Sequence, residues 1–508
     1  MTPVRAAPRR RATPVRVRAS RAIAAAIAVA ALAACGPIVR VGPDYAGPPA
    51  ARPLPAADAR APSGDAAGGW QARLPHSGSP TDLARWWSQF DDPALDAFVD
   101  AGQLASGTLA QAAARIEQAG AAAVAAGAAA RPGLDLQAGV SRGTLNLGTQ
   151  IFLVNQARAT VQAAWELDLF GRIAREREAA GARLDAAAAQ WHDARVSVAA
   201  EVAGQYLQYR YCEALVAIAQ ADAASRAETA VVTERATAAG FQAPASAALA
   251  RASAAEAASR LTAQRAECDV IVKTLVALTA LDEPALRARL AQGAGRLPVP
   301  REFEVTAVPA ELLAQRPDLA AAERALAAAS ADIGVAEGDR YPRLSLTGSV
   351  GPLRLQGSNF AGTLNTWSIG PSLTLPLLDA GRRRANVESA RAAYAAAEAD
   401  YRARARQAVR EVEESLVRLR SAADRETDAR VASEGYRRAF EAAEVRFRTG
   451  LGSLLDLEDA RRLSLGADST LAGVRRDRIA AWVTLYRALG GGWTARDAAP
   501  PKLLESSR

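Results

Sequence analysis

Four segments of the chain alternate apolar and polar residues with the two-residue period of a β-strand. They form two pairs, and the sequence predicts strands over about residues 133–142, 158–170, 342–351 and 366–378. The stretches within each pair, Gly143–Gln156 and Pro352–Asn365, are rich in glycine and asparagine and are expected to be hairpin loops. Strands of about ten residues with one apolar and one polar face suit a transmembrane barrel, although a β-sandwich would give the same pattern.

Two proline-free stretches, Gly171–Gly240 and Gly381–Gly450, are dominated by alanine, arginine and glutamate. This composition strongly favours helix. Each stretch would span about 100 Å at the helical rise per residue, which is longer than a compact domain needs. Apolar residues such as Val409, Val412 and Leu416 recur with the spacing of a coiled coil. The predicted fold is therefore mostly helical, with strand hairpins inserted between long coiled helices.

The order of these elements is repeated along the chain. The stretch from about Leu109 to Ala280 recurs from about Leu319 to Gly490, and every matched residue is displaced by 210 positions, so that Gly240 falls on Gly450. A duplication of this length predicts two equivalent halves. The predicted first repeat is residues 81–300, the second is residues 301–493, and residues 494–508 are a C-terminal tail.

The start of the chain has the features of an export signal. Seven arginines and no acidic residue lie in residues 1–34, and the apolar run Ala22–Ala31 is too short to span a bilayer as a helix. Removal of this segment lowers the net charge from +8 to +1, so the high pI does not indicate a nucleic-acid partner. Leu32-Ala33-Ala34-Cys35 resembles a bacterial lipobox, which implies cleavage before Cys35 and lipidation of its thiol. By the same resemblance, Gly36 after the cysteine implies delivery to the outer membrane. Residues 35–80, rich in proline, glycine and alanine after Val41, are expected to be an extended, lipid-anchored tether.

Cys212 and Cys268 match no metal-binding spacing, and small buried apolar residues are the default interpretation for such cysteines. A disulfide is the alternative. Cys212 lies 28 residues before Gly240 and Cys268 lies 28 residues after it, so an antiparallel helix hairpin that turns near Gly240 would bring the two thiols level.

Residues suited to catalysis are scarce. The only histidines are His76, in the predicted tether, and His192, within a long predicted helix, so neither a histidine-based triad nor a histidine-rich metal site is credible. Gly490-Gly491-Gly492 follows a helix and fits a C-terminal stop better than a phosphate-binding loop. We therefore expect no enzymatic activity, no metal and no cofactor other than the lipid on Cys35.

Several separate motifs, in the right order, resemble the outer-membrane factors of bacterial tripartite efflux systems, of the TolC and OprM type and especially their NodT-like lipoprotein branch. The motifs are Val41-Gly42-Pro43-Asp44-Tyr45, Trp86-Trp87 with Phe90-Asp91-Asp92-Pro93, Glu166-Leu167-Asp168-Leu169-Phe170-Gly171-Arg172, Arg316-Pro317-Asp318, Phe447-Arg448-Thr449-Gly450 and Leu485-Tyr486-Arg487-Ala488-Leu489-Gly490. The resemblance implies a homotrimer with a twelve-stranded barrel in the outer membrane and a twelve-helix periplasmic tunnel. The apolar strand faces would then contact lipid. The polar faces, which include Glu166 and Asp168, would line the water-filled interior.

The resemblance also implies roles for the two helix turns. The tips, at Gly240-Phe241 and Gly450-Leu451-Gly452-Ser453, would contact a periplasmic adaptor protein. Asp456 and Asp459 match family positions whose carboxylates ring the tunnel entrance, although both acids also fit an ordinary exposed helix face near Arg461 and Arg462. Gly452 stands where TolC-like members carry a latching arginine, so Arg448 and Arg461 are alternative candidates for a latch.

The expected function is a passive, lipid-anchored exit duct in the outer membrane that works with an adaptor and an inner-membrane transporter of the RND type. Two alternatives stay open. The channel could export polypeptides, or the protein could be a periplasmic lipoprotein that bridges membranes without conducting. The apolar strand faces with Trp165 and Trp367 argue against the bridging protein, because a coiled coil has no use for a lipid-facing surface.

Overall fold

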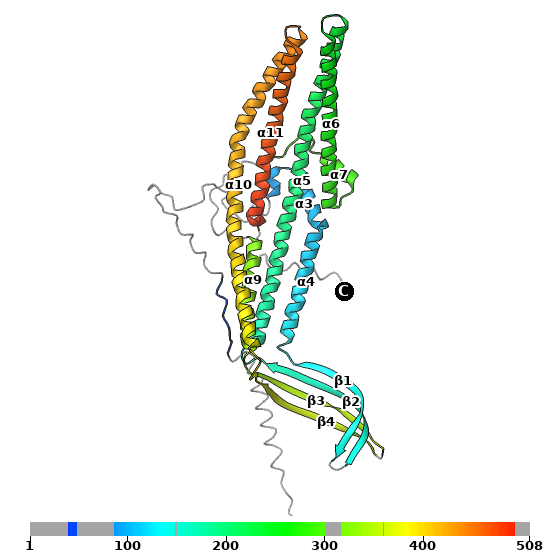
Figure 1. The fold of residues 1–508 in the computed structure, drawn as a ribbon, viewed down its shortest axis with the longest axis vertical. Coiled ribbons are helices and arrows are strands. Elements are labelled where there is room, and N and C mark those ends of the chain that lie inside the picture. Colours follow the sequence, from blue (N-terminus) through cyan, green and yellow to red (C-terminus); the bar gives the residue numbers. More distant parts are fainter. Residues whose placement is uncertain (1–38, 48–85, 148–149, 300–315, 359, 493–508) are drawn as a thin grey trace, which may run out of the picture. The chain divides into compact units, whose positions relative to one another are not determined.

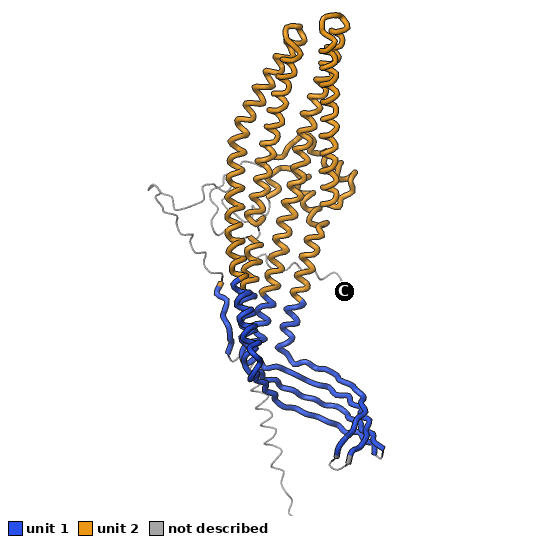
Figure 2. The backbone as a smooth tube through the Cα atoms, in the orientation of Figure 1, with its two compact units in different colours: residues 1–46, 121–181, 327–395 blue, residues 47–120, 182–326, 396–508 orange. Residues whose placement is uncertain are grey.

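The computed structural model of the chain describes residues 39–47, 86–147, 150–299, 316–358 and 360–492 (Figure 1). The predicted signal peptide, Cys35, most of the predicted tether with His76, and the C-terminal tail lie outside these residues. The chain divides into two compact units (Figure 2), one formed by residues 1–46, 121–181 and 327–395 and the other by residues 47–120, 182–326 and 396–508. Each unit takes segments from both sequence repeats, so the repeats are not separate compact bodies.

The predicted repeat is visible in the bounds of the helices. Each pair of equivalent helices begins at positions 210 residues apart: α4 (Gly107–Ala128) with α9 (Pro317–Gly338), α5 (Arg172–Ala238) with α10 (Arg382–Arg448), and α6 (Pro244–Thr279) with α11 (Leu454–Ala488). The additional helices η1 (Trp87–Phe90), α3 (Pro93–Ala105), α7 (Glu283–Ala291) and η2 (Gly490–Gly492) complete the described set. None of the helices in the described ranges combines the length and the apolar character needed to cross a membrane.

The first unit contains one antiparallel sheet in the order β1-β2-β3-β4, with strands at Gly133–Leu147, Gln150–Leu167, Arg343–Gln356 and Ala361–Thr374. The strands are longer than the predicted ten residues. The chain reverses within each of the predicted stretches 143–156 and 352–365. The predicted bounds of the loops are wrong, because most of each stretch continues the ladders, with Thr144 paired to Leu153 and Arg354 to Thr363. Glycine and asparagine in these stretches suggested loops, but the strand partner satisfies the backbone regardless of composition.

In the half of the sheet nearer the helices, residues of like polarity lie opposite one another across the four strands. On one face, Val161 is paired with Leu136 on β1 and with Val350 on β3, and Val350 is paired with Trp367 on β4. On the other face, Gln162 is paired with Asp135 and Ser349, and the Ser349 and Ser368 hydroxyls lie 2.8 Å apart. Up to Val140 on β1 and Val350 on β3 the sheet therefore has one apolar face, on which Trp367 is 75% exposed in the single chain. Beyond these residues the polarity inverts, since Arg354 lies on the Trp367 face and Leu353 lies on the Ser349 face.

The β2–β3 ladder is interrupted at Gly351-Pro352. The β2–β3 ladder pairs Arg158 with Leu353 and Val161 with Val350 but skips the two positions between them. Proline has no N–H to donate, and a Cβ on Gly351 would lie only 1.9 Å from the Ala159 carbonyl oxygen. Glycine is therefore required where β3 approaches β2 most closely.

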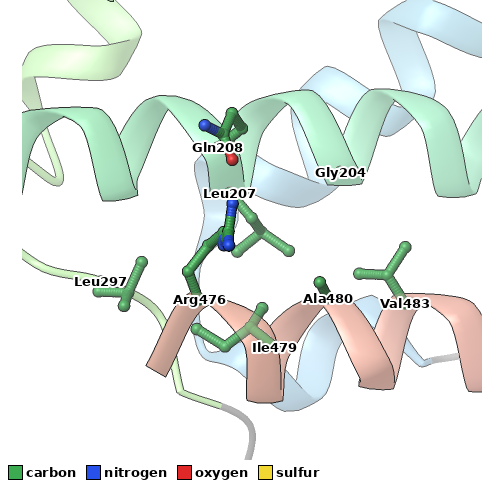
Figure 3. A pocket seen from close by; sticks show the side chains of 8 residues that line it. All are labelled: Gly204, Leu207, Gln208, Leu297, Arg476, Ile479, Ala480 and Val483. Atoms are coloured by element: carbon green, nitrogen blue, oxygen red, sulfur yellow. The ribbon is translucent and has the colours of Figure 1, made fainter. Parts of the chain in front are cut away.

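The core of the second unit is aromatic and lies where η1 and α3 meet α5 and α11. Trp86 and Phe98 are buried there with Tyr206, Trp482 and Tyr486, and the ring centroids of Trp87 and Tyr486 are 4.7 Å apart. The tryptophan pair of the Trp86-Trp87 motif thus belongs to this core. Figure 3 shows a small cavity between α5 and α11, lined by Leu207, Ile479 and Val483 among others, with a volume of about 40 Å³. A cavity of this size can hold water but no transported molecule.

Candidate channel entrance

The two helix turns have the same backbone geometry. Gly240 follows α5 with φ of +81°, and Gly450 follows α10 with φ of +78°. The Phe241 N–H donates to the Ala236 carbonyl, and the Leu451 N–H donates to the Arg446 carbonyl, both at 2.8 Å. This is the hydrogen-bond pattern of a Schellman motif, in which glycine takes the left-handed position. The next residues, Phe241 and Leu451, are 84% and 81% exposed, so each tip presents one large apolar side chain.

The turns differ in how the following helix begins. At the second tip, the Ser453 hydroxyl accepts from the Asp456 N–H at 3.1 Å, and the Asp456 carboxylate accepts from the Ser453 N–H at 3.4 Å. This reciprocal arrangement is a capping box. At the first tip, Ala243 is the N-cap and no side chain caps α6. Asp456 therefore has a local structural role that its equivalent, Ser246, does not share.

Asp459 lies about one helical turn beyond Asp456. Its carboxylate pairs with the Arg462 guanidinium at 3.1 Å, and both side chains are largely exposed. The structure thus brings the two acids together in the first turns of α11, each with a partner inside the chain. Whether they also form a ring depends on other copies of the chain, so the entrance ring remains a prediction.

A buried polar cluster joins the two helix hairpins beside the second tip. Arg461, on α11, is 2% exposed and donates to the Thr229 hydroxyl at 2.8 Å and the Ser225 hydroxyl at 3.1 Å, both on α5. Glu458 pairs with Arg461 and also with Arg226 of α5. We call Asp222, Ser225, Arg226, Thr229, Glu458 and Arg461 the hairpin junction.

Burial dominates the electrostatics of the hairpin junction. Desolvation lowers the pKa of Arg461, and the nearby carboxylates of Glu458 and Asp222 oppose this effect only in part. The Arg461 guanidinium lies 5.4 Å from the centroid of the Phe440 ring. A cavity of about 500 Å³ lies beside it and is lined by Asp222, Phe440 and Arg461 among other residues. The junction is therefore joined mainly by hydrogen bonds and ion pairs rather than by close apolar packing.

Both arginines proposed as latch candidates from the sequence contact the first hairpin. Arg461 does so through the hairpin junction, and Arg448 pairs with Glu228 of α5 at 3.1 Å. Sequence reasoning missed Arg226 and Glu458. The only signal was the position of Arg226 and Glu458 close to the two turns, which does not distinguish them from neighbouring charged residues.

The junction of strand and helix in the first unit explains two further motifs. Arg175 is buried and donates to the Asp44 carboxylate at 2.5 Å and to the Val41 carbonyl at 3.3 Å, which holds the Val41–Tyr45 motif in place. Glu166 pairs with Arg172 at 3.1 Å, and the Asp168 carboxylate accepts from two N–H groups at the start of α5. The prediction that Glu166 and Asp168 line water therefore missed their structural contacts.

The two cysteines of the first hairpin form a disulfide. Cys212 on α5 and Cys268 on α6 are bonded, with their Cα atoms 5.7 Å apart. The default interpretation of two free buried thiols is therefore wrong, and the alternative raised by the equal spacing of these residues about Gly240 is correct.

Known proteins resemble the chain over nearly its whole length. The family model of outer membrane efflux proteins matches residues 103–281 and 308–491. Nodulation protein T of Rhizobium leguminosarum bv. viciae is 31% identical over 466 residues, covering 91% of this chain and 92% of the relative. The pyoverdine export outer membrane protein OpmQ of Pseudomonas putida is 31% identical over 446 residues, 84% of this chain and 92% of the relative.

Solved structures of outer-membrane channels also resemble the chain. The outer-membrane channel OprN is 30% identical, and the comparison covers 85% of this chain and 99% of that chain with a TM-score of 0.75. The Campylobacter jejuni CmeC outer membrane channel is 21% identical with a TM-score of 0.75, over 91% of this chain and 98% of that chain, and so shares the fold. The duplicated helices, the two-faced sheet and these matches together establish that the chain belongs to the outer membrane efflux protein family.

Proposed function

We propose that this protein is the outer-membrane exit duct of a tripartite efflux pump, through which small molecules leave the periplasm passively. The observation that carries the proposal is the four-stranded sheet, which has one apolar and one polar face in the half nearer the helices. Such a sheet suits a wall between lipid and water. Relatives named as outer membrane proteins of toluene and solvent efflux pumps support the same function.

The sheet also supports a homotrimer. In the single chain β1 and β4 are edge strands, each paired on one side only. Unpaired strand edges are not tolerated in lipid, and about eight strands are the practical minimum for a closed barrel. Three chains would supply twelve strands and pair every edge, so assembly would complete the barrel.

The proposal also includes two partner proteins and a lipid anchor. The exposed Phe241 and Leu451 at the tips would contact a periplasmic adaptor, and an inner-membrane transporter of the RND type would supply the energy. Lipid on Cys35 would anchor the chain in the outer membrane.

We place the entrance at the second tip. Asp456 and Asp459 lie there in the first turns of α11, and Ser246 and Leu249 replace them at the first tip. In a trimer each acid would occur three times around one axis, which attracts cations. The entrance would therefore be cation-selective.

The test is the conductance of the purified protein in a planar bilayer, compared with the double variant Asp456→Asn, Asp459→Asn. Asparagine removes the charge but keeps an oxygen that can accept the Ser453 N–H, so the capping box survives. We expect a small, cation-selective conductance for the unchanged protein. The variant should lose cation selectivity.

Two control variants separate charge at the entrance from other effects. Ser453→Ala removes the cap and keeps both carboxylates, so selectivity should not change. Glu234→Gln removes an exposed charge near the first tip, where Glu234 pairs with Arg251, and should also leave selectivity unchanged. Silence of well-folded protein would overturn the duct, while conductance with unaltered selectivity in the double variant would overturn the entrance assignment.

A further inference from the structure

The disulfide marks a boundary within the α5–α6 hairpin. Leu207 on α5 and Val272 on α6, about one helical turn from the two cysteines on the side away from the tip, belong to the main core of the second unit. On the side toward the tip, residues 213–267 contain no buried side chain larger than aspartate or threonine. The buried residues in this range are Asp222, Thr229, Ala230, Thr233, Ala247, Ala250 and Ala257.

The distal part of this hairpin therefore has little apolar packing. Burial of an alanine methyl group removes far less apolar surface from water than burial of leucine or valine, and the hydrophobic contribution scales with that area. Of the larger apolar residues in the same range, Val231, Val232, Phe241 and Leu249 are exposed. Leu215, Val216, Ile218 and Leu261 are only partly buried. Polar links, such as the Arg260–Asp222 pair at 3.3 Å and the Arg226–Ser253 hydrogen bond, join α5 to α6 here, and the disulfide adds a covalent link.

The second hairpin solves the same problem differently. The residues 210 positions after Cys212 and Cys268 are Ala422 and Arg478. Arg478 pairs with Glu426 at 3.0 Å, one turn from Ala422, and Arg475 pairs with the same carboxylate at 3.1 Å. Toward the tip, Leu454 is buried against Ala230 and Ala250 of the first hairpin. An ion pair thus stands where the first hairpin has a covalent bond.

We propose that the Cys212–Cys268 disulfide is a staple that a thiol oxidoreductase installs during folding, and that only the α5–α6 hairpin depends on it. In the reaction the two thiols lose two protons and two electrons to the disulfide of the oxidoreductase. One S–S bond forms in this chain, and the oxidoreductase is left as a dithiol. This inference concerns assembly and does not rest on the proposed duct function.

The burial of the cysteines determines when exchange can occur. Both residues are buried in the folded hairpin, and exchange requires a thiolate to reach a sulfur atom. The bond must therefore form while the hairpin is still open, and the folded protein should resist reductants until it unfolds.

Limited trypsin digestion tests the dependence, with cleavage sites identified by mass spectrometry. In the variant Cys212→Ala, Cys268→Ala, cleavage after Arg235 and Arg251 should accelerate by at least about tenfold, because local opening of the first hairpin becomes more frequent. Cleavage after Arg446 and Arg462 in the second hairpin should stay within about twofold of the unchanged protein. No acceleration, or equal acceleration in both hairpins, would overturn the proposal.

Arg478→Ala is the matched control, since it removes the ionic link at the equivalent position of the second hairpin. A partly exposed ion pair contributes little, so cleavage after Arg446 and Arg462 should rise by no more than about twofold. If cleavage of the second hairpin in Arg478→Ala rose as much as cleavage of the first hairpin in the double cysteine variant, the covalent bond would have no special role.

Thiol labelling tests the bond and its timing, and applies even where the double variant fails to fold. Iodoacetamide should label neither Cys212 nor Cys268 in denatured protein that has not been reduced. It should also label neither in folded protein treated with dithiothreitol. Both should be labelled after reduction in denaturant. Labelling without reduction would refute the bond. Labelling of folded, dithiothreitol-treated protein would refute the assigned order of bond formation and folding.

Discussion

Equivalent residues in the two repeats have different environments, and Arg251 and Arg461 show this most clearly. They stand 210 positions apart in the aligned repeats. Arg251 is exposed and pairs with Glu234, whereas Arg461 is buried and contacts Ser225 and Thr229 of the other hairpin. The same residue type is thus a surface charge in one half and part of the hairpin junction in the other.

This difference predicts the effect of removing each kind of arginine. Arg461→Ala should lower the free energy of unfolding by about 2–4 kcal/mol, because it leaves the Thr229 and Ser225 hydroxyls without this donor and removes one of the two arginines that pair with Glu458. Arg462→Ala, which removes only the exposed pair with Asp459, should cost less than about 1 kcal/mol. Urea unfolding of the detergent-solubilised protein, followed by tryptophan fluorescence, measures both. Equal effects would show that the hairpin junction does not stabilise the fold.

At the scale of elements, helices were more predictable than strands. The long proline-free stretches identified α5 and α10 almost to the residue, because composition and the absence of breakers act over many turns. Strand ends were missed because glycine and asparagine indicate turns only where no neighbouring strand is available. The interruption of the β2–β3 ladder at Gly351-Pro352 depends on how closely β2 approaches, which a single sequence does not reveal.

The two faces of β4 give a direct test of membrane insertion. Ile369→Arg places a charge on the apolar face and should cost about 2–4 kcal/mol near the bilayer midplane. Ser368→Arg, one residue earlier on the polar face, should cost less than about 1 kcal/mol. The measurement is the fraction of protein that inserts into liposomes and runs as the folded species on a heat-modifiability gel. Insertion that is equally impaired by both substitutions would contradict the assignment of faces.

At the scale of the whole molecule, the repeat and the family were predictable from the sequence, but the contacts at the candidate entrance were not. The 210-residue displacement gave the two tips, and the tip acids were found by resemblance. The capping box of Asp456, the Arg226–Glu458 pair and the role of Arg175 depend on side-chain directions and on contacts between distant segments. Periodicity carries no information on these contacts.

The open edges of the sheet predict the assembled mass. Native mass spectrometry of the protein released from detergent should give three chains, because three four-stranded sheets close one barrel without unpaired edges. A charged substitution at Ile369 should reduce this species, whereas Ser368→Arg should preserve it. A monomer that inserts into bilayers and conducts would contradict closure by trimerisation.

The near-identical turns at Gly240 and Gly450 have a consequence for the symmetry of such a trimer. Features common to both repeats, such as the turn backbone and its exposed apolar residue, would recur six times around the axis, at intervals of about 60°. Features found in one repeat only, such as Asp456, Asp459 and the disulfide, would recur three times, at intervals of about 120°. A partner that recognises the shape of the tips would find six similar binding positions. A partner that recognises the charge of the tips would find three.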